Sequence, residues 1–220
     1  MNVSRQRDAG DRAEKGPRAR TRRLMLETAT RLMQTGATPS VSEVAEAAEV
    51  SRATAYRYFP SQAALVQAVV DEALGPILTW RSGSKNAERR VAALLSSAMP
   101  RIEAFEATFK AALKLSLDQW ALRQAGTLGS EPEFARGHRK DLLKDAIAPL
   151  KGRLPPRAFD RLAQALSLVF GVEVLVVLKD MWGLGSAETL SVTQWAAAAL
   201  VRAAVEETTL VGEADLPSAA

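Results

Sequence analysis

The 220-residue sequence contains no cysteine, and its single histidine is His138. Without cysteine the chain cannot form disulfide bonds, thiolate zinc sites or a cysteine nucleophile. One histidine cannot supply a two-histidine metal site within a subunit, and a Ser-His-Asp triad would depend on His138 alone. We therefore expect a protein that is not an enzyme, with no catalytic residue, no metal ligand and no cofactor.

Long apolar runs are lacking as well. Residues 1–23 include no apolar stretch, so no signal-peptide pattern opens the sequence. The longest apolar run, residues 165–178, is interrupted by Glu173 and is shorter than the ~20 residues that a membrane-spanning helix needs. These features predict a soluble protein of the cytoplasm.

Positive charge is concentrated at the start of the sequence. The net charge is +4 and the isoelectric point is about 9.6, and residues 1–23 hold eight basic side chains against three acidic ones. Such an arm suits contact with a polyanion, although basic tails also serve only to keep a chain soluble. We predict a disordered basic arm over residues 1–17 and a disordered polar tail over residues 209–220.

Strand-like alternation of polar and apolar residues is nearly absent, and almost every periodic stretch has helical spacing. The sequence therefore predicts an all-α fold of nine helices in two domains, a small one over residues 18–78 and a larger one over residues 79–208. Helices are expected at 18–35, 41–48, 52–59 and 62–80, then twice after a polar break at 81–86, and finally at 133–151, 155–182 and 187–208.

Residues 40–59 carry the strongest motif. Ser40 and Glu43 stand three apart, the spacing of a capping box in which the serine hydroxyl accepts from the Glu43 amide. Ala45 is small enough to let the next helix cross closely, and Ser51 can cap a second helix after a tight turn. Two short helices, a tight turn and an alanine at the crossing predict a helix-turn-helix.

The second helix of this motif has an unusual surface. Ala55 and Phe59, at positions i and i+4, can face the core. The remaining side chains then point outward or sideways: Arg52, Ala53, Thr54, Tyr56, Arg57 and Tyr58. Arginine can pair bidentately with guanine, alanine and threonine can meet a thymine methyl group, and tyrosine can donate to phosphate. The alternative is a solvated helix whose tyrosines pack on neighbours.

The stretch from Arg20 to about Leu74 resembles the DNA-binding domain of the TetR family of bacterial regulators. The matching residues are Met25, Ala29 and Met33, then Ser40-Val41, Glu43-Val44-Ala45, Val50-Ser51, Thr54, Tyr56, Tyr58-Phe59-Pro60-Ser61 and Leu65. The resemblance implies an all-helical homodimer whose recognition helices enter successive major grooves of a palindromic DNA operator. It also implies a larger domain that dimerises and binds a small effector that releases DNA.

On this resemblance the predicted DNA contacts combine base readers with phosphate anchors. Arg52, Thr54, Tyr56 and Arg57 are expected to read bases or position the helix, with Ser51 and Ala53 beside them, while Arg18, Arg20, Arg22, Ser40, Tyr58 and Gln62 hold phosphates. Three positions depart from the family pattern. Glu49 replaces a turn glycine, so the turn is either strained or shaped differently. Ala55 replaces a larger aliphatic residue, and Gln62 replaces a phosphate-binding lysine.

The last two predicted helices are expected to form a dimer interface, because alanines on one helix and branched residues on the other allow close approach. The alternative is that both are core helices of a monomer. The expected interface residues are Leu166, Val169, Phe170, Glu173, Val176, Trp195, Ala199, Leu200, Arg202 and Ala203. Glu173 is expected to pair with Arg202 or with an interfacial water, or else to lie at an exposed rim.

A ligand pocket is expected among the four helices that precede the last one. Phe105, Phe109, Trp120 and Phe134 would form apolar walls, with Gln119, Arg123 and His138 as polar anchors. Plain core packing would explain the same aromatic residues. The apolar composition suggests a hydrophobic effector.

Gly75 and Pro76 fall near the end of the helix that joins the two domains. Proline lacks an N–H and clashes with the carbonyl of Glu72, so the helix should kink or end there. A hinge at this point would couple the pocket to the DNA-binding domain, and an ordinary kink is the alternative.

Together these features predict a DNA-binding transcriptional regulator, with repression by a ligand-released homodimer as the expected mode. A helical adaptor with a degenerate helix-turn-helix is the alternative, supported only by Glu49 and Gln62. An all-helical enzyme is disfavoured, because the sequence has neither a glycine-rich phosphate loop nor a clustered carboxylate pair.

Overall fold

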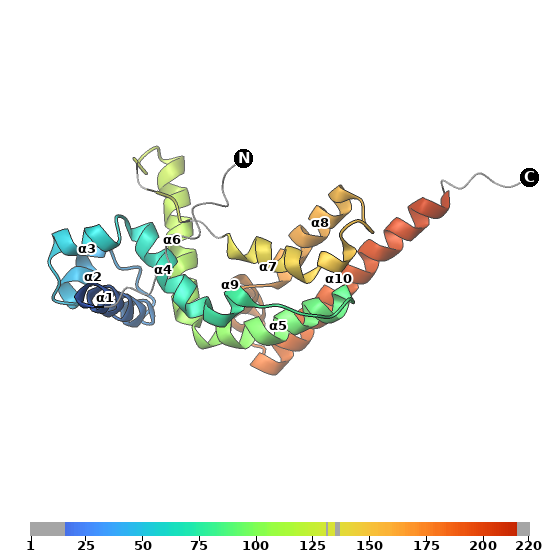
Figure 1. The fold of residues 1–220 in the computed structure, drawn as a ribbon, viewed down its shortest axis with the longest axis horizontal. Coiled ribbons are helices and arrows are strands. Elements are labelled where there is room, and N and C mark those ends of the chain that lie inside the picture. Colours follow the sequence, from blue (N-terminus) through green and yellow to red (C-terminus); the bar gives the residue numbers. More distant parts are fainter. Residues whose placement is uncertain (1–15, 131, 135–136, 215–220) are drawn as a thin grey trace, which may run out of the picture. The chain divides into compact units, whose positions relative to one another are not determined.

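The computed structural model describes residues 16–130, 132–134 and 137–214 of the chain. Within these ranges the secondary structure is helical, with no β-strand and only an isolated bridge between Lys151 and Leu154. The all-α fold predicted from helical periodicity is confirmed (Figure 1). The predicted arm, apart from its last two residues, and the last six residues of the predicted tail lie outside the described residues.

The first six helices follow the prediction closely. They are α1 (Pro17–Met33), α2 (Val41–Ala47), α3 (Arg52–Tyr58), α4 (Gln62–Leu74), α5 (Ala87–Ala104) and α6 (Glu106–Gln124). Local chemistry sets several of their starts. At α5, for example, the side chain of Asn86 accepts a hydrogen bond from the backbone N–H of Arg89 at 2.9 Å.

The end of α4 before Pro76 confirms the predicted stop. Gly75–Thr79 continues the chain as a short 3-10 helix. Arg101 of α5 binds the carbonyl groups left at the end of α4: its Nε lies 2.5 Å from the oxygen of Ala73, and its Nη2 lies 3.2 Å from that of Glu72. The guanidinium group therefore caps the helix where the hinge was predicted.

Two predicted helices of the C-terminal half are broken. The helix expected at 133–151 is observed as α7 (His138–Ala146) and a 3-10 turn (Ala148–Leu150). The helix expected at 155–182 is observed as α8 (Pro156–Leu166), a 3-10 turn (Ser167–Val169), α9 (Val172–Leu175) and a π-helix (Val176–Met181). The last helix is α10 (Ser186–Ala214).

The prediction of one continuous helix over 155–182 is wrong because the backbone changes direction at Gly171. This glycine has a φ of 112°, which an α-helix does not contain. The two parts of the bent segment, Pro156–Val169 and Val172–Met181, meet at 48°. Among the described residues no single helix is long and apolar enough to cross a membrane, and only these two parts taken together reach that length and composition.

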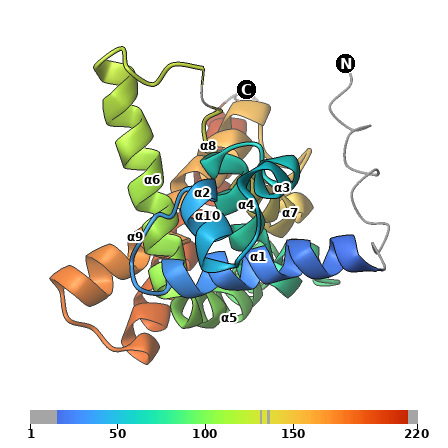
Figure 2. The ribbon, with the colours of Figure 1, turned by 90° about the vertical axis from the view of Figure 1, so that its left-hand side faces the viewer.

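The described chain divides into two compact units, the first of which comprises residues 16–69 and Lys114–Phe134. In this unit α2 contacts both α1 and α3, and Figure 2 shows α1 beside α2. Met25, Val44 and Leu65 are fully buried. α1, α2 and α4 therefore each contribute a side chain to the core of this unit.

The second unit comprises Val70–Leu113 and, after the gap in the described chain, residues 137–214. Here α10 packs along α5 and α8, and α7 also contacts both α5 and α8 (Figure 1). Leu94, Leu143 and Leu175 lie in its core. The domain boundary expected at residue 78 separates two functions as well as two compact parts. Compactness alone does not test it, and it stays a prediction.

Candidate nucleic-acid interface

The capping box at the start of α2 forms as the sequence predicts. The backbone N–H of Glu43 donates to the hydroxyl of Ser40 at 3.2 Å, and Glu43 Oε2 accepts from the backbone N–H of Ser40 at 2.7 Å. The latter bond, with a smaller contribution from the hydroxyl, lowers the pKa of Glu43.

The turn between α2 and α3 has a left-handed residue at Glu49, with a φ of 54°. It is the one non-glycine residue with positive φ within the described ranges. The N–H of Val50 donates to the carbonyl of Ala45 at 2.8 Å, and that of Glu49 to the carbonyl of Glu46 at 3.1 Å. This pair of bonds is a Schellman motif, with Glu49 at the left-handed position where glycine is usual.

α3 begins at a second capping serine. Ser51 Oγ accepts from the N–H of Thr54 at 3.3 Å and donates to Thr54 Oγ1 at 2.9 Å. Ala55 and Phe59 are buried, which confirms the predicted inward face. The opposite side of α3 is therefore directed away from the core.

The outward side of α3 carries the predicted reading surface. Arg52, Ala53, Tyr56 and Arg57 are exposed, and Thr54 and Tyr58 are half-buried. The guanidinium group of Arg57 lies 5.6 Å from the ring centre of Tyr58, and the Tyr56 hydroxyl lies 3.4 Å from Ser42 Oγ. This side of the helix offers guanidinium and hydroxyl donors and a methyl group, the groups used in direct readout of the major groove.

The predicted phosphate anchors differ in whether their donor groups are already hydrogen-bonded within the protein. Arg18, Arg20 and Arg22 are exposed on α1, and the Arg22 guanidinium group lies 5.6 Å from the ring centre of Phe59, at the end of α3. Gln62 Nε2 instead donates to the carbonyl of Thr38 at 2.7 Å. One of its amide hydrogens is thus committed within the protein, which leaves Gln62 a weaker phosphate anchor than the three arginines.

The seven predicted pocket residues fall into both units. Phe105, Phe109 and His138 belong to the second unit, whereas Gln119, Trp120, Arg123 and Phe134 belong to the first. Within the first unit Gln119 Oε1 accepts from the N–H of Phe134 at 2.8 Å, and Arg123 pairs with Glu133 at 2.5 Å. These contacts hold residues 132–134 against α6, and Trp120 is exposed. Neither unit by itself assembles the seven residues into one site.

A surface hollow of ≈ 460 Å³ lies elsewhere in the second unit. Its lining comes from the start of α5, the turn after α7 and α10, and includes Glu88, Leu150, Arg153, Val201 and Arg202. None of the seven predicted pocket residues lines it.

The predicted dimer residues are divided between the protein core and its surface. Leu166 and Phe170 are buried inside the protomer, and Val169, Glu173, Val176, Ala199 and Leu200 are half-buried. Trp195, Arg202 and Ala203 are exposed. The predicted pairing of Glu173 with Arg202 is not observed: Glu173 binds Arg139, and Arg202 pairs with Glu88 at 3.0 Å.

The sequence reasoning missed several exposed apolar residues. Leu168 is 80%, Met181 73%, Trp182 72% and Trp195 71% exposed, with Val177 and Val192 also exposed. We call these six residues the exposed apolar set; only Trp195 was among the predicted interface residues. Gly171 was the available signal, since a glycine inside an apolar run marks a point where helical periodicity can break.

Residues 25–69 match the model of the bacterial regulatory proteins of the tetR family. Among solved structures the chain is similar to a TetR transcriptional regulator from Rhodococcus sp. RHA1, with a TM-score of 0.55 and 22% sequence identity, covering 83% of this chain and 96% of that chain. At this identity the likeness shows a shared fold. No protein of curated function matches the chain.

The family match begins inside α1 and ends inside α4, and it includes the whole helix-turn-helix. Both short helices, the tight turn and the outward donors of α3 lie inside it. This segment of the chain is a DNA-binding domain of the kind found in the tetR family of bacterial regulatory proteins.

Proposed function

We propose that this protein represses transcription as a homodimer that binds a palindromic operator through α3 and leaves it when a small hydrophobic effector binds. The outward side of α3 carries the proposal, since Arg52, Tyr56 and Arg57 are exposed beside Thr54. Arg22 of α1, whose guanidinium group lies over Phe59 at the end of α3, supplies a cation for the flanking phosphate. Such a protein would act in the cytoplasm, where bacterial DNA lies.

The exposed apolar set supports the homodimer. Large apolar side chains that are open to water mark an interaction site when they form a contiguous patch. Five of the six belong to the bent segment or to α10, and Trp182 directly follows the bent segment. A two-fold interface there would match the two-fold symmetry of a palindromic operator.

A buried hydroxyl supports the effector. Thr108 of α6 is fully buried, and its Oγ1 makes no hydrogen bond within the described part of the chain. Such a group usually has a partner, so a ligand with a hydrogen-bonding group beside an apolar body would satisfy it. Phe109, one of the predicted pocket walls, follows it directly. A Thr108→Val protein should lose its response to such an effector and keep its DNA affinity.

The experiment that tests the proposal selects bound sequences from a random pool of DNA duplexes. Native protein is compared with a Tyr56→Ala, Arg57→Ala double variant and with Arg157→Ala as control. The control removes the same charge from an exposed position on α8. We expect native protein and control to enrich one palindrome with half-sites about one helical turn apart or slightly more, and the double variant to lose it.

The same selection separates the helical adaptor from the regulator. No enrichment by native protein, or enrichment indifferent to Tyr56 and Arg57, would mean that α3 is not the reading helix. A protein partner would then be the better explanation of the exposed surfaces.

A further inference from the structure

The bend between α8 and α9 is held by a side chain from another helix. Arg139, in the first turn of α7, donates from Nη1 to the carbonyl of Ser167 at 3.2 Å and from Nη2 to the carboxylate of Glu173. Its two partners lie on opposite sides of Gly171. A single guanidinium group therefore bridges the bend, with both members of the ion pair half-buried.

The position of Gly171 beside this guanidinium group requires a glycine for two reasons. Its φ of 112° is strained for any residue with a Cβ. A Cβ built there would also lie only 2.8 Å from Cζ of Arg139. The bend and the arginine therefore require each other: glycine makes the close approach possible, and Arg139 binds the polar groups on either side.

The residue before Arg139 binds α4. Nε2 of His138 donates to Oδ1 of Asp71 at 2.7 Å. Asp71 lies in the last turns of α4, the helix that begins directly after the helix-turn-helix. Two consecutive residues of α7 thus contact α4 on one side and the bend on the other.

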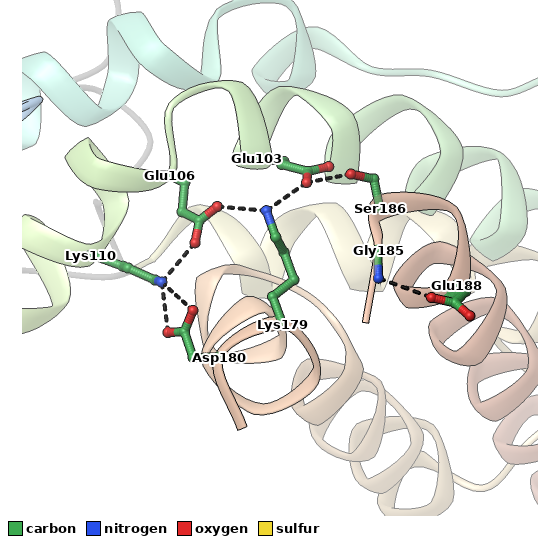
Figure 3. Close-up of polar contacts among 8 residues, drawn as sticks. All are labelled: Glu103, Glu106, Lys110, Lys179, Asp180, Gly185, Ser186 and Glu188. Carbon is green, nitrogen blue, oxygen red and sulfur yellow. Dashed lines mark hydrogen bonds and ion pairs between the residues drawn. The ribbon is translucent and has the colours of Figure 1, made fainter. Parts of the chain in front are cut away.

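The far part of the bent segment is held by an ion-pair network (Figure 3). Lys179 of the π-helix lies 2.7 Å from Glu103 and 2.9 Å from Glu106, and Asp180 pairs with Lys110 at 2.7 Å. Since this part is fixed on the α5–α6 junction, a change at the bend would act mainly on α8 and on its position relative to the π-helix. Leu168 lies before the bend and Trp182 after it, so the bend sets the spacing between members of the exposed apolar set.

We propose that His138 and Arg139 form a clamp that positions the dimer surface relative to α4. The clamp rests on the proposed function, since it concerns the homodimer and its operator. Arg139 sets the angle at which the exposed apolar set is presented, and His138 ties that angle to the last turn of α4. Both are positioning residues that touch no DNA.

The first test uses the full chain with Arg139→Met, Arg139→Lys and, as control, Arg161→Met. Arg161 pairs with Glu207 between α8 and α10, so the control removes an arginine ion pair from the same segment without touching the bend. Dimer dissociation constants are measured by sedimentation equilibrium, with helix content checked by circular dichroism. We expect Arg139→Met to weaken dimerisation at least about tenfold, equal to ~1.4 kcal/mol, and the control to stay within about twofold.

Arg139→Lys keeps the charge but lacks the planar fork that reaches both partners, so it should be intermediate. This variant keeps the test decisive if Arg139→Met fails to fold. Native dimer affinity in Arg139→Lys together with Arg139→Met, or equal losses in Arg139→Met and the control, would overturn the role of Arg139.

The second test uses His138→Phe and the operator obtained by selection. Affinity is measured for that operator and for versions whose half-site spacing is changed by one or two base pairs. We expect His138→Phe to dimerise like the native protein and to discriminate between spacings at least about fivefold less, or ~1 kcal/mol. A native spacing profile would overturn the link to α4. If native protein selects no palindrome, the proposed function fails, while the dimer measurements still judge Arg139.

Discussion

At the scale of single residues, Glu49 shows a local cost that the fold tolerates. Its φ of 54° places a side chain where glycine is normal. Left-handed backbone costs a non-glycine residue about 1–2 kcal/mol, whereas glycine elsewhere loses about 0.5–1 kcal/mol through its greater freedom when unfolded. We therefore expect Glu49→Gly to raise the free energy of unfolding by about 0.5–1 kcal/mol, measured by urea denaturation.

Ala47→Gly is the matched control for this prediction. Ala47 is the exposed last residue of α2, two positions earlier, and has ordinary helical backbone. Glycine there should lower the free energy of unfolding by about 0.5–1 kcal/mol. If both variants lose stability, the turn at Glu49 holds no strain.

Arg22 offers a second prediction at this scale. If it meets a phosphate beside α3, Arg22→Ala should weaken binding about equally for all DNA sequences and reduce the slope of log K against log salt by about 0.9. Fluorescence anisotropy between 50 and 200 mM salt, roughly the usual working range, would measure the slope. Arg89→Ala, an exposed arginine of α5, should leave it unchanged. A changed sequence preference in Arg22→Ala would instead make Arg22 a base reader.

At the scale of helices, local chemistry decided what could be predicted. The capping box of Ser40 and Glu43, the inward Ala55 and the stop before Pro76 depend on residues a few positions apart, and all three were predictable. The bend at Gly171 depends on Arg139, which is 32 positions away in the chain. No pattern of helical period contains that contact, and so the bent segment was expected to be straight.

The same limit explains why some of the predicted interface residues are buried inside the protomer. Leu166 and Phe170 were expected at the interface on the assumption that residues 155–182 form one continuous helix. Both are buried, and beyond the bend a π-helix shifts the register further, which brings Met181 and Trp182 to the surface. Glu173, expected to meet Arg202, was within reach of Arg139 only because the chain turns there.

The ion-pair network of Figure 3 predicts how stability depends on pH. Hydrogen bonds from Lys179 and Ser186 lower the pKa of Glu103 below 4.5. Burial raises the pKa of Glu106, but bonds from Lys110 and Lys179 outweigh this and lower it too. A depressed folded pKa stabilises the fold above the unfolded value, and that contribution is lost as pH falls through the folded pKa.

The two lysines determine how stability depends on pH on the alkaline side. Hydrogen bonds that Lys179 donates to Glu103 and Glu106 raise its pKa above 10.5. Burial lowers the pKa of Lys110, but the bonds that it donates to Asp180 and Glu106 outweigh burial and raise it. Their contribution is present below 10.5 and is lost as pH rises through the folded pKa. The network should thus contribute its full stability at pH values above 4.5 and below 10.5.

We expect the midpoint of urea unfolding to fall on the acid side for native protein and to fall less for Glu106→Gln. Glu206→Gln, a carboxylate on the exposed side of α10, should keep the native profile. If the urea midpoints of native protein and Glu106→Gln fall equally as the pH is lowered, the network adds no pH-dependent stability.

At the scale of the whole molecule, the remaining question is what the exposed apolar set meets. A folded protomer that leaves Trp182, Trp195 and Met181 mostly in water loses the hydrophobic stabilisation that their burial would supply. In a two-fold interface each residue would occur twice, so one substitution would alter two copies of the contact. An aspartate at a central position would also place two like charges in an apolar contact.

Trp182→Asp should therefore convert the dimer into a folded monomer. Central aromatic residues of an interface typically cost about 2–4 kcal/mol when lost, and a monomer would bind a half-site with only non-cooperative affinity. Size-exclusion chromatography with light scattering measures the mass, and operator binding follows it. Leu117→Asp, at an exposed apolar position of α6, is the control and should stay dimeric. A Trp182→Asp protein that remains dimeric would move the interface away from the bent segment, and the clamp of His138 and Arg139 would then be left with no surface to position.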